Sequence, residues 1–255
     1  MKVGFVGAGS MAAAMARGWA GAEGGPEAML FSDSGSGRAA TLADELGGEE
    51  IDTLTELGRE ADLVVVAVKP NALASAAGGL AGSAKAVISV LGATPLGRLE
   101  AAFPATPMVR TMPNLAVEVR RGVICHAPIA VPAPLGAEVL DLLGLLGRTV
   151  EVDEDLLDAA TAVMGCSPAY FALTAEALAE AGADQGLDPE LARELVVETL
   201  AGTGVLLATR HPADLRDAVA SPGGSTEAGL EALVEAGAKQ ALDGAVKASM
   251  ERMRS

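Results

Sequence analysis

The sequence is poor in the residue types that build several common kinds of functional site. Its 255 residues include four Phe, one Trp and one Tyr, and 18 Lys and Arg stand against 34 Asp and Glu, giving a formal net charge of −16. A net negative charge of this size repels a phosphate backbone, so we expect no nucleic-acid partner. The scarcity of aromatic side chains also argues against platforms on which bases stack.

Cysteine and histidine are equally scarce, with two of each. Cys125 and Cys166 lie too far apart for a CxxC site, and two Cys cannot make a disulfide framework. His126 and His211 leave little for a metal centre, so we expect no metal. No apolar run reaches the roughly 18 residues of a membrane span. These absences predict a cytoplasmic protein without a membrane partner.

The first part of the chain, residues 1–152, alternates short apolar runs with helical patterns. We expect strands at Lys2–Val6, Ala28–Phe31, Leu63–Val68, Ala86–Val90, Pro107–Arg110, Gly122–His126 and Thr149–Val152, and helices at Ser10–Gly21, Gly37–Leu46 and Leu135–Leu146. The run Leu63–Val68 is almost entirely apolar and β-branched, as in a strand buried on both faces of a parallel sheet. This alternation predicts an α/β domain of the Rossmann type, built from βαβ units.

The second part, residues 153–255, has Ala-rich helical patterns and no β-branched runs. We expect helices at Pro168–Gly186, Pro189–Thr209, Asp214–Ala220, Thr226–Ala236 and Lys239–Arg252. The first two open with Pro near the first helical turn, where its missing N–H costs nothing. The sequence therefore predicts an all-α domain after the α/β domain.

A glycine-rich segment follows the first predicted strand and opens the first predicted helix. It comprises Gly7, Ala8, Gly9, Ser10, Met11 and Ala12, a G-x-G-x-x-A pattern. Gly7 permits a tight turn, Gly9 lets a pyrophosphate approach the backbone, and Ala12 lets the helix pack closely on the strand. The position of this pattern in a strand–turn–helix context predicts a dinucleotide site with the phosphates at the helix N-terminus.

The end of the second strand bears on the choice between NAD and NADP. Asp33 stands where an acid binds the ribose hydroxyls of NAD. Ser32, Ser34, Ser36 and Arg38 surround it, and hydroxyls with an arginine suit the 2′-phosphate of NADP. Because of Arg38 we favour NADP, with NAD as the alternative.

A polar segment ends the most apolar strand. It consists of Val68, Lys69, Pro70 and Asn71. Ligands of this fold bind outside the carboxyl ends of the strands, so we expect this segment to contact the cofactor. An exposed loop cation would explain Lys69 as well.

A second candidate site lies between two predicted helices, at Ser221-Pro222-Gly223-Gly224-Ser225-Thr226. Pro-Gly-Gly makes a sharp turn, and Ser225 or Thr226 can cap the following helix. The free N–H groups there form a receptor for a small carboxylate, with the hydroxyls of Ser221 and Thr226 as further donors. A plain helix–helix connection explains the pattern equally well.

The residues also disfavour one class of dehydrogenase. A hydroxy-acid dehydrogenase needs a group such as Lys or His to move the hydroxyl proton. In the related β-hydroxyacid dehydrogenases the catalytic Lys falls in the region that corresponds to Glu151–Leu200. In this sequence that segment contains neither Lys nor His. A substrate that takes a hydride without strong acid catalysis fits better, and a protonated imine is one.

Together these segments resemble the pyrroline-5-carboxylate reductases. The resemblance rests on Gly7–Ala12, Val68–Pro70, Val109–Asn114, Ser167–Tyr170, Ala181–Leu187, His211–Asp217 and Ser221–Thr226, and it covers nearly the whole chain. The last of these segments is the most specific.

The resemblance implies a reductase that makes L-proline from L-1-pyrroline-5-carboxylate with NAD(P)H, the last step of proline biosynthesis. Loop N–H groups from Gly224 and Ser225, with Ser221, would hold the substrate carboxylate, and Thr226 would hydrogen-bond the ring nitrogen as the catalytic residue. The helical domains of two subunits would interlock, and the loop of one subunit would meet a nicotinamide held by the other. The family forms homodimers and, in many members, decamers of five dimers.

The chain departs from the family pattern at two places. Leu115 and Ala116 follow Met-Pro-Asn where the family usually has Thr-Pro, and Met164-Gly165-Cys166-Ser167 replaces Ser-Gly-Ser-Gly. These departures leave two alternatives open: an NAD(P)H-dependent reductase of another cyclic imine, and a non-catalytic NAD(P)-binding paralogue.

Overall fold

The computed structural model describes residues 1–80, 82–129 and 131–254. The chain forms two compact units, of which the first holds Met1–Cys166 with the last residues from Met250 onward, and the second holds Ser167–Ser249. The predicted domain boundary at residues 152 and 153 lies just after strand β8 (Gly147–Glu151). The segment from Glu154 to Cys166 packs with the first unit.

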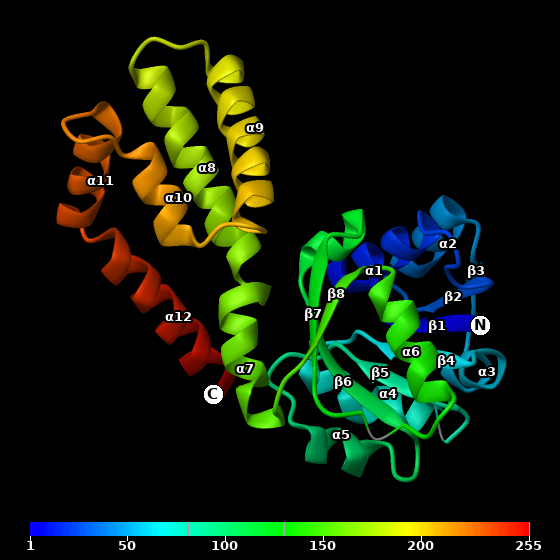
Figure 1. Ribbon diagram of the computed structural model, residues 1–255. Coiled ribbons are helices and arrows are strands. Elements are labelled where there is room, and N and C mark those ends of the chain that lie inside the picture. The colour runs from blue at the N-terminus through cyan, green and yellow to red at the C-terminus, as the bar shows by residue number, and fades with distance from the viewer. Residues whose placement is uncertain (81, 130, 255) are drawn as a thin grey trace. The chain divides into compact units, whose positions relative to one another are not determined.

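The first unit is built around one sheet of eight strands with the order β3-β2-β1-β4-β5-β6-β7-β8 (Figure 1). The strands are β1 (Lys2–Val6), β2 (Ala28–Ser32), β3 (Glu49–Glu50), β4 (Leu63–Val66), β5 (Val87–Ser89), β6 (Met108–Pro113), β7 (Gly122–His126) and β8. All neighbours pair in parallel except β6 and β7, which are antiparallel. The Rossmann-type α/β fold expected from the sequence is therefore confirmed.

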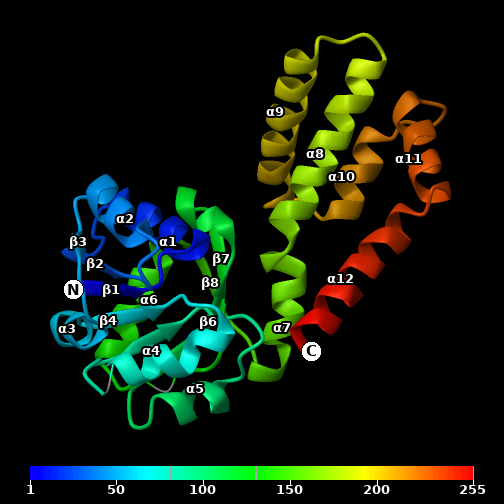
Figure 2. The same ribbon diagram turned by 180° about the vertical axis from the view of Figure 1, so that it is seen from behind.

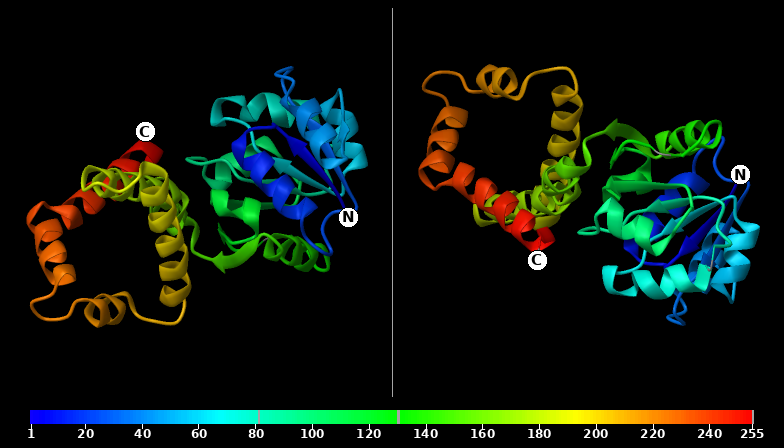
Figure 3. Two further views of the ribbon diagram at one scale, coloured as in Figure 1. Left: turned by 90° about the horizontal axis from the view of Figure 1, so that it is seen from above. Right: turned by 90° about the horizontal axis from the view of Figure 1, so that it is seen from below.

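Helices cover both faces of this sheet, as the views from above and below show (Figure 3). One face carries α1 (Ser10–Ala20), α2 (Arg38–Leu46) and α6 (Leu135–Gly144); the other carries α3 (Leu54–Glu60), α4 (Leu73–Leu80) and α5 (Leu96–Ala102). Because side chains alternate along a strand, Leu63 and Val65 enter the first core, whereas Val64 and Val66 enter the second. This double burial accounts for the continuous apolar sequence of β4.

Four short elements were not expected from the sequence: β3, α3, α4 and α5. Short 3₁₀ segments also occur: η1 (Pro70–Ala72) follows β4, η2 (Leu115–Val119) connects β6 to β7, and η3 (Glu154–Leu156) follows β8. The chain leaves the first unit through α7 (Leu157–Ala160) and a single π-helical turn, η4 (Thr161–Gly165).

The second unit is entirely helical, as expected. It contains α8 (Ser167–Asp184), α9 (Pro189–Leu207), α10 (Pro212–Val219), α11 (Ser225–Glu235) and most of α12 (Ala238–Arg254). Helices α8 and α9 pack against each other, and α10, α11 and α12 follow them in sequence (Figure 2). The Asp188 carboxylate caps α9 by accepting hydrogen bonds from the N–H groups of Glu190 and Leu191.

The helices of the second unit expose large apolar side chains. Examples are Phe171, Leu173, Leu195 and Val205, the last of which is 73% exposed. The continuous helical run Glu154–Asp184 is also long and apolar enough to cross a membrane, by length and composition alone. An exposed apolar surface of this extent marks a region that another surface covers.

Candidate functional site

A cavity of about 540 Å³ opens in the first unit at the carboxyl ends of β1, β2 and β4. Strand β1 lies between the other two there, so the order of strands reverses direction at this point, which is where ligands bind in open α/β sheets. Of the residues expected to bind a cofactor, Gly7, Ala8, Gly9, Ser34, Arg38, Val68, Lys69 and Asn71 line the cavity. Ser10 and Met11 are instead the first residues of α1, and Pro70 begins η1.

The two glycines of the phosphate loop are required for different reasons. Gly7 has a φ of +96°, and a Cβ there would lie 2.8 Å from the carbonyl oxygen of Ala67. Gly9 has an ordinary extended backbone, and a Cβ there would meet no atom within 4 Å. The fold therefore demands a glycine at position 7, whereas at position 9 only a ligand that approaches the backbone would demand one.

The loop after β2 is organised by the carboxylate of Asp33. Partial burial opposes its ionisation, but hydrogen bonds from the Ser36 hydroxyl and from the N–H groups of Ala39, Gly35 and Ser36 outweigh that effect and lower the pKa of Asp33 to about 2. Arg38 is exposed, and its Nε donates to the Ser36 hydroxyl over 3.0 Å. The carboxylate is thus charged throughout the physiological pH range.

Among the other residues that line the cavity, Asp52, Leu54 and Ser75 were not indicated by the sequence. Asp52 and Leu54 stand at the start of α3, and Ser75 lies in α4, two helices that were not predicted. Without those helices, no sequence signal would have placed these side chains at the edge of the sheet.

The second candidate site is the loop before α11. Gly223 has a φ of +72°, and the Gly224 N–H donates to the Ser221 carbonyl oxygen over 2.9 Å, which closes a turn. The prediction that Ser225 or Thr226 caps α11 is wrong: the N-cap is Gly224, without a side-chain cap, and the two hydroxyl residues begin the helix itself. Their side chains are exposed.

A carboxylate of the chain itself occupies part of this loop. Glu227 Oε2 accepts a hydrogen bond from the Gly223 N–H over 2.7 Å. Within the described residues, the backbone N–H groups of Ser225 and Thr226 have no hydrogen-bond partner. The head of α11 therefore offers free donors to an anion, and one neighbouring donor already holds a carboxylate. Sequence reasoning missed Glu227, although an acid three residues into a helix is a known capping signal.

His126, His211 and Cys125 make contacts that serve the fold. His211 Nδ1 accepts from the Ala213 N–H and so caps α10, and His126 is buried with Nδ1 2.9 Å from the Ala127 carbonyl oxygen. Burial raises the pKa of the Cys125 thiol, which disfavours its reactive thiolate form. Across the described ranges, no group of three His, Cys, Asp or Glu side chains is placed to hold a metal ion.

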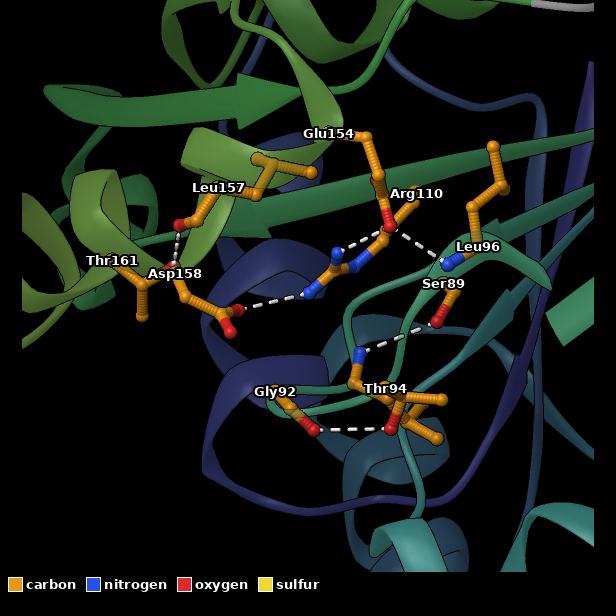
Figure 4. Close-up of polar contacts among 10 residues, drawn as sticks. Ser89, Gly92, Thr94, Leu96, Arg110, Glu154, Leu157, Asp158 and Thr161 are labelled. Atoms are coloured by element: carbon orange, nitrogen blue, oxygen red, sulfur yellow. Dashed lines mark hydrogen bonds and ion pairs between the residues drawn. The ribbon is translucent and has the colours of Figure 1, made fainter. Parts of the chain in front are cut away.

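A buried cation holds the chain where it leaves the sheet. The Arg110 side chain is 4% exposed and lies between two carboxylates, with Nη1 2.6 Å from Glu154 and Nη2 3.1 Å from Asp158 (Figure 4). Glu154 Oε1 also accepts from the Leu96 N–H over 2.8 Å. Arg110 Nε and Glu154 Oε2 are buried and find no partner among the residues that the structure describes. The cluster thus anchors η3 and α7 to strand β6.

The chain is similar to known proteins over nearly its whole length. Residues 154–255 match the family profile described as pyrroline-5-carboxylate reductase dimerisation, and residues 2–92 match the profile described as NADP oxidoreductase, coenzyme F420-dependent. The pyrroline-5-carboxylate reductase of Synechocystis is 34% identical over 99% of this chain and 97% of its own length. The enzyme of Thermus thermophilus is 36% identical over the same shares.

A solved structure agrees with these relatives. The pyrroline carboxylate reductase of Plasmodium falciparum with NADP bound has a TM-score of 0.89 and 29% sequence identity, covering 100% of this chain and 97% of its own.

We predict that replacing Glu154 by Gln destabilises the first unit. The substitution keeps the shape of the side chain but leaves buried Arg110 with one carboxylate, at a cost of about 2 kcal/mol in the free energy of unfolding. Urea denaturation measures this change. The matched control is Glu190→Gln, which removes an exposed ion pair with Arg193 and costs less than about 1 kcal/mol. Equal effects of the two substitutions would contradict the prediction.

Proposed function

The chain belongs to the pyrroline-5-carboxylate reductase family, and from this premise we propose that it reduces L-1-pyrroline-5-carboxylate to L-proline with a hydride from NADPH, the last step of proline biosynthesis. The observation that carries the proposal is the loop at the head of α11: its Gly223 N–H binds a carboxylate within the chain, and the N–H groups of the exposed residues Ser225 and Thr226 have no partner among the described residues. The substrate is a small cyclic imine with one carboxylate, which suits such a loop.

The residues of the first cavity fit a dinucleotide. Neither the backbone conformation nor the packing at position 9 requires a glycine, so the missing side chain leaves room for a pyrophosphate. We assign the phosphates to the backbone of Gly7–Met11 at the N-terminus of α1, and the 2′-phosphate to Ser34 and Arg38. Lys69 and Asn71 contact the cofactor from the segment Val68–Asn71. When bound, NADPH supplies the hydride.

The substrate site lies in the second unit. The Ser221 hydroxyl and the N–H groups of the loop from Gly224 to Thr226 hold the carboxylate, and the Thr226 hydroxyl hydrogen-bonds the ring nitrogen. A protonated imine carries a positive charge on C=N–H⁺, so one hydride on the carbon gives the secondary amine without any further group to deliver a proton. The protein contributes mainly position and electrostatics, which agrees with the lack of Lys and His between Glu151 and Leu200.

We further propose that a second copy of the chain covers the exposed apolar side chains of α8 and α9. The dimerisation profile spans these helices, and interlocked helical domains, residues 153–255, would form a homodimer, with a decamer of five dimers as the larger assembly. The same argument assigns the apolar run Glu154–Asp184 to a protein interface in a cytoplasmic enzyme rather than to a membrane.

The purified protein, assayed with pyrroline-5-carboxylate and either NADPH or NADH, tests the activity. We expect oxidation of the cofactor and formation of proline. Absence of turnover with intact cofactor binding would select the non-catalytic paralogue, and turnover only with another cyclic imine would select a different substrate.

We predict that Thr226→Ala lowers kcat by roughly 10²-fold, because the ring nitrogen loses its positioned partner. Affinity for NADPH, measured by calorimetry, should stay unchanged, since the cofactor lies on other residues. Thr209→Ala, an exposed threonine at the end of α9, serves as the control and should keep full activity. An unchanged kcat in Thr226→Ala would refute the role assigned to this hydroxyl.

We predict that Gly9→Ala folds normally but loses affinity for NADPH by at least about tenfold, a change of about 1.4 kcal/mol. The new methyl group enters open space and points where the pyrophosphate would lie. Thermal unfolding and calorimetric titration measure the two effects separately. Gly78→Ala in α4 is the matched control, because its Cβ also meets nothing within 4 Å. Wild-type NADPH affinity in Gly9→Ala would sink this assignment.

We predict a particle of at least twice the mass of one chain in detergent-free buffer, measured by light scattering. Phe171→Glu and Leu195→Glu place charges on exposed apolar side chains of α8 and α9 and should shift the protein toward monomer. A wild-type monomer, or wild-type protein that sediments with lipid vesicles, would contradict the homodimer.

A further inference from the structure

The carboxylate of Asp33 accepts five hydrogen bonds from its own loop, more than the number of lone pairs on its two oxygens. Oδ1 accepts from the N–H groups of Gly35, over 2.7 Å, and Ser36, over 2.9 Å. Oδ2 accepts from the Ser36 hydroxyl over 2.5 Å and from the N–H groups of Arg38 and Ala39, each over 3.1 Å. A carboxylate has about four lone-pair sites, so these five donors saturate it.

This saturation removes Asp33 from the role that its position suggests. In dinucleotide-binding folds, an acid at the end of the second strand accepts hydrogen bonds from the ribose hydroxyls of NAD. Asp33 lines the cavity, yet both of its oxygens face the loop that follows it. No lone pair remains for a ribose hydroxyl unless the loop unfolds.

The loop gains a definite shape from these bonds. Gly35 and Gly37 adopt left-handed backbones, with φ values of +84° and +75°, and a Cβ at either would meet no atom within 4 Å. Glycine is thus needed there for conformation and not for space. Helix α2 begins at Arg38, so the Asp33 carboxylate also accepts hydrogen bonds from the first two N–H groups of that helix, those of Arg38 and Ala39.

The same bonds place a cation at the cavity. The Ser36 hydroxyl donates to Asp33 and accepts from Arg38 Nε over 3.0 Å. This link orients the guanidinium of Arg38, and its two terminal nitrogens have no partner within the described part of the chain. A guanidinium with two free terminal nitrogens is suited to bidentate binding of a phosphate.

We propose that Asp33 is a positioning residue for the 2′-phosphate of NADPH: it folds the loop from Ser34 to Arg38 and presents Ser34 and Arg38 to the phosphate, while binding no part of the ribose itself. The proposal rests on the NADPH preference of the proposed function. It reverses the usual expectation for an acid at this position, because Asp33 then favours NADPH instead of excluding it.

The test compares the affinities of 2′,5′-ADP and 5′-AMP, which differ only in the 2′-phosphate, by calorimetry on the intact protein. Wild type should bind 2′,5′-ADP at least about tenfold more tightly. Asp33→Asn keeps the size of the side chain but turns an NH₂ group toward the donors on Oδ2, so the loop should rearrange and the preference should fall below about threefold. Affinity for 5′-AMP should stay within twofold.

Asp44→Asn is the matched control, since it removes the same charge from an exposed position on α2 that does not line the cavity. It should not lower affinity for 2′,5′-ADP. A double-mutant cycle with Arg38→Ala adds a measurement that a purely structural role would not change. If Asp33 acts partly through Arg38, the loss in the double variant should be smaller than the sum of the two single losses.

The outcomes separate the two claims. Equal affinities of wild type for the two nucleotides would defeat the NADPH preference and, with it, the role of Asp33. A wild-type preference that survives in Asp33→Asn, or that increases as expected for a ribose ligand, would overturn only the role of Asp33. If Asp33→Asn does not fold, Ser36→Ala provides the decision: it breaks the link to Arg38 while Asp33 keeps its four backbone donors, and an unchanged preference there would also contradict the proposal.

Discussion

The backbone at Gly7 passes so close to the end of strand β4 that a side chain at this position would meet the carbonyl oxygen of Ala67 at 2.8 Å. This contact brings the turn after β1 against its neighbouring strand and starts α1 directly above the sheet. Gly7, Ala67 and Val68 all line the cavity at the carboxyl ends of β1, β2 and β4. The close approach of the two backbones therefore brings the phosphate loop and the Val68–Asn71 segment to the same cavity.

Sequence reasoning succeeded where burial imposes a regular pattern. Strand β4 is buried on both faces, so its four consecutive residues are all apolar, and this run predicts the strand. The start of helix α9 is indicated by Pro189 directly after the capping residue Asp188. The pattern failed where an element is short or nearly featureless. Helix α4 reads Leu-Ala-Ser-Ala-Ala-Gly-Gly-Leu, in which small residues hide the helical period, and β3 is only two exposed glutamates. The antiparallel direction of β7 depends on pairing with β6, which no local pattern reveals.

For the candidate sites, the sequence identified the right segments but not their internal bonding. Glycines 7 and 9 look alike in a motif, and only the structure shows that one serves the fold and the other leaves open space. Asp33 and Arg38 supported opposite cofactors from sequence alone, because the number of donors around a carboxylate is a property of the folded loop. At α11 the expected hydroxyl cap is absent, and Glu227 instead accepts a hydrogen bond from the N–H of Gly223, the residue before the N-cap Gly224.

Both candidate sites must bind an anion in a chain of net negative charge, and both use N–H donors that lie beside a carboxylate of the chain itself. A chain of net charge −16 repels both an anionic cofactor and an anionic substrate, so local donors must attract them. In each loop an internal carboxylate already engages these donors, but to a different extent. Asp33 holds five hydrogen bonds and stays in place as part of the loop. Among the described residues Glu227 holds one, and a hydrogen bond to a charged group contributes about 1.5–3 kcal/mol. Moving Glu227 breaks one such bond, whereas moving Asp33 breaks five. The Asp33 carboxylate is therefore the more firmly held of the two acids.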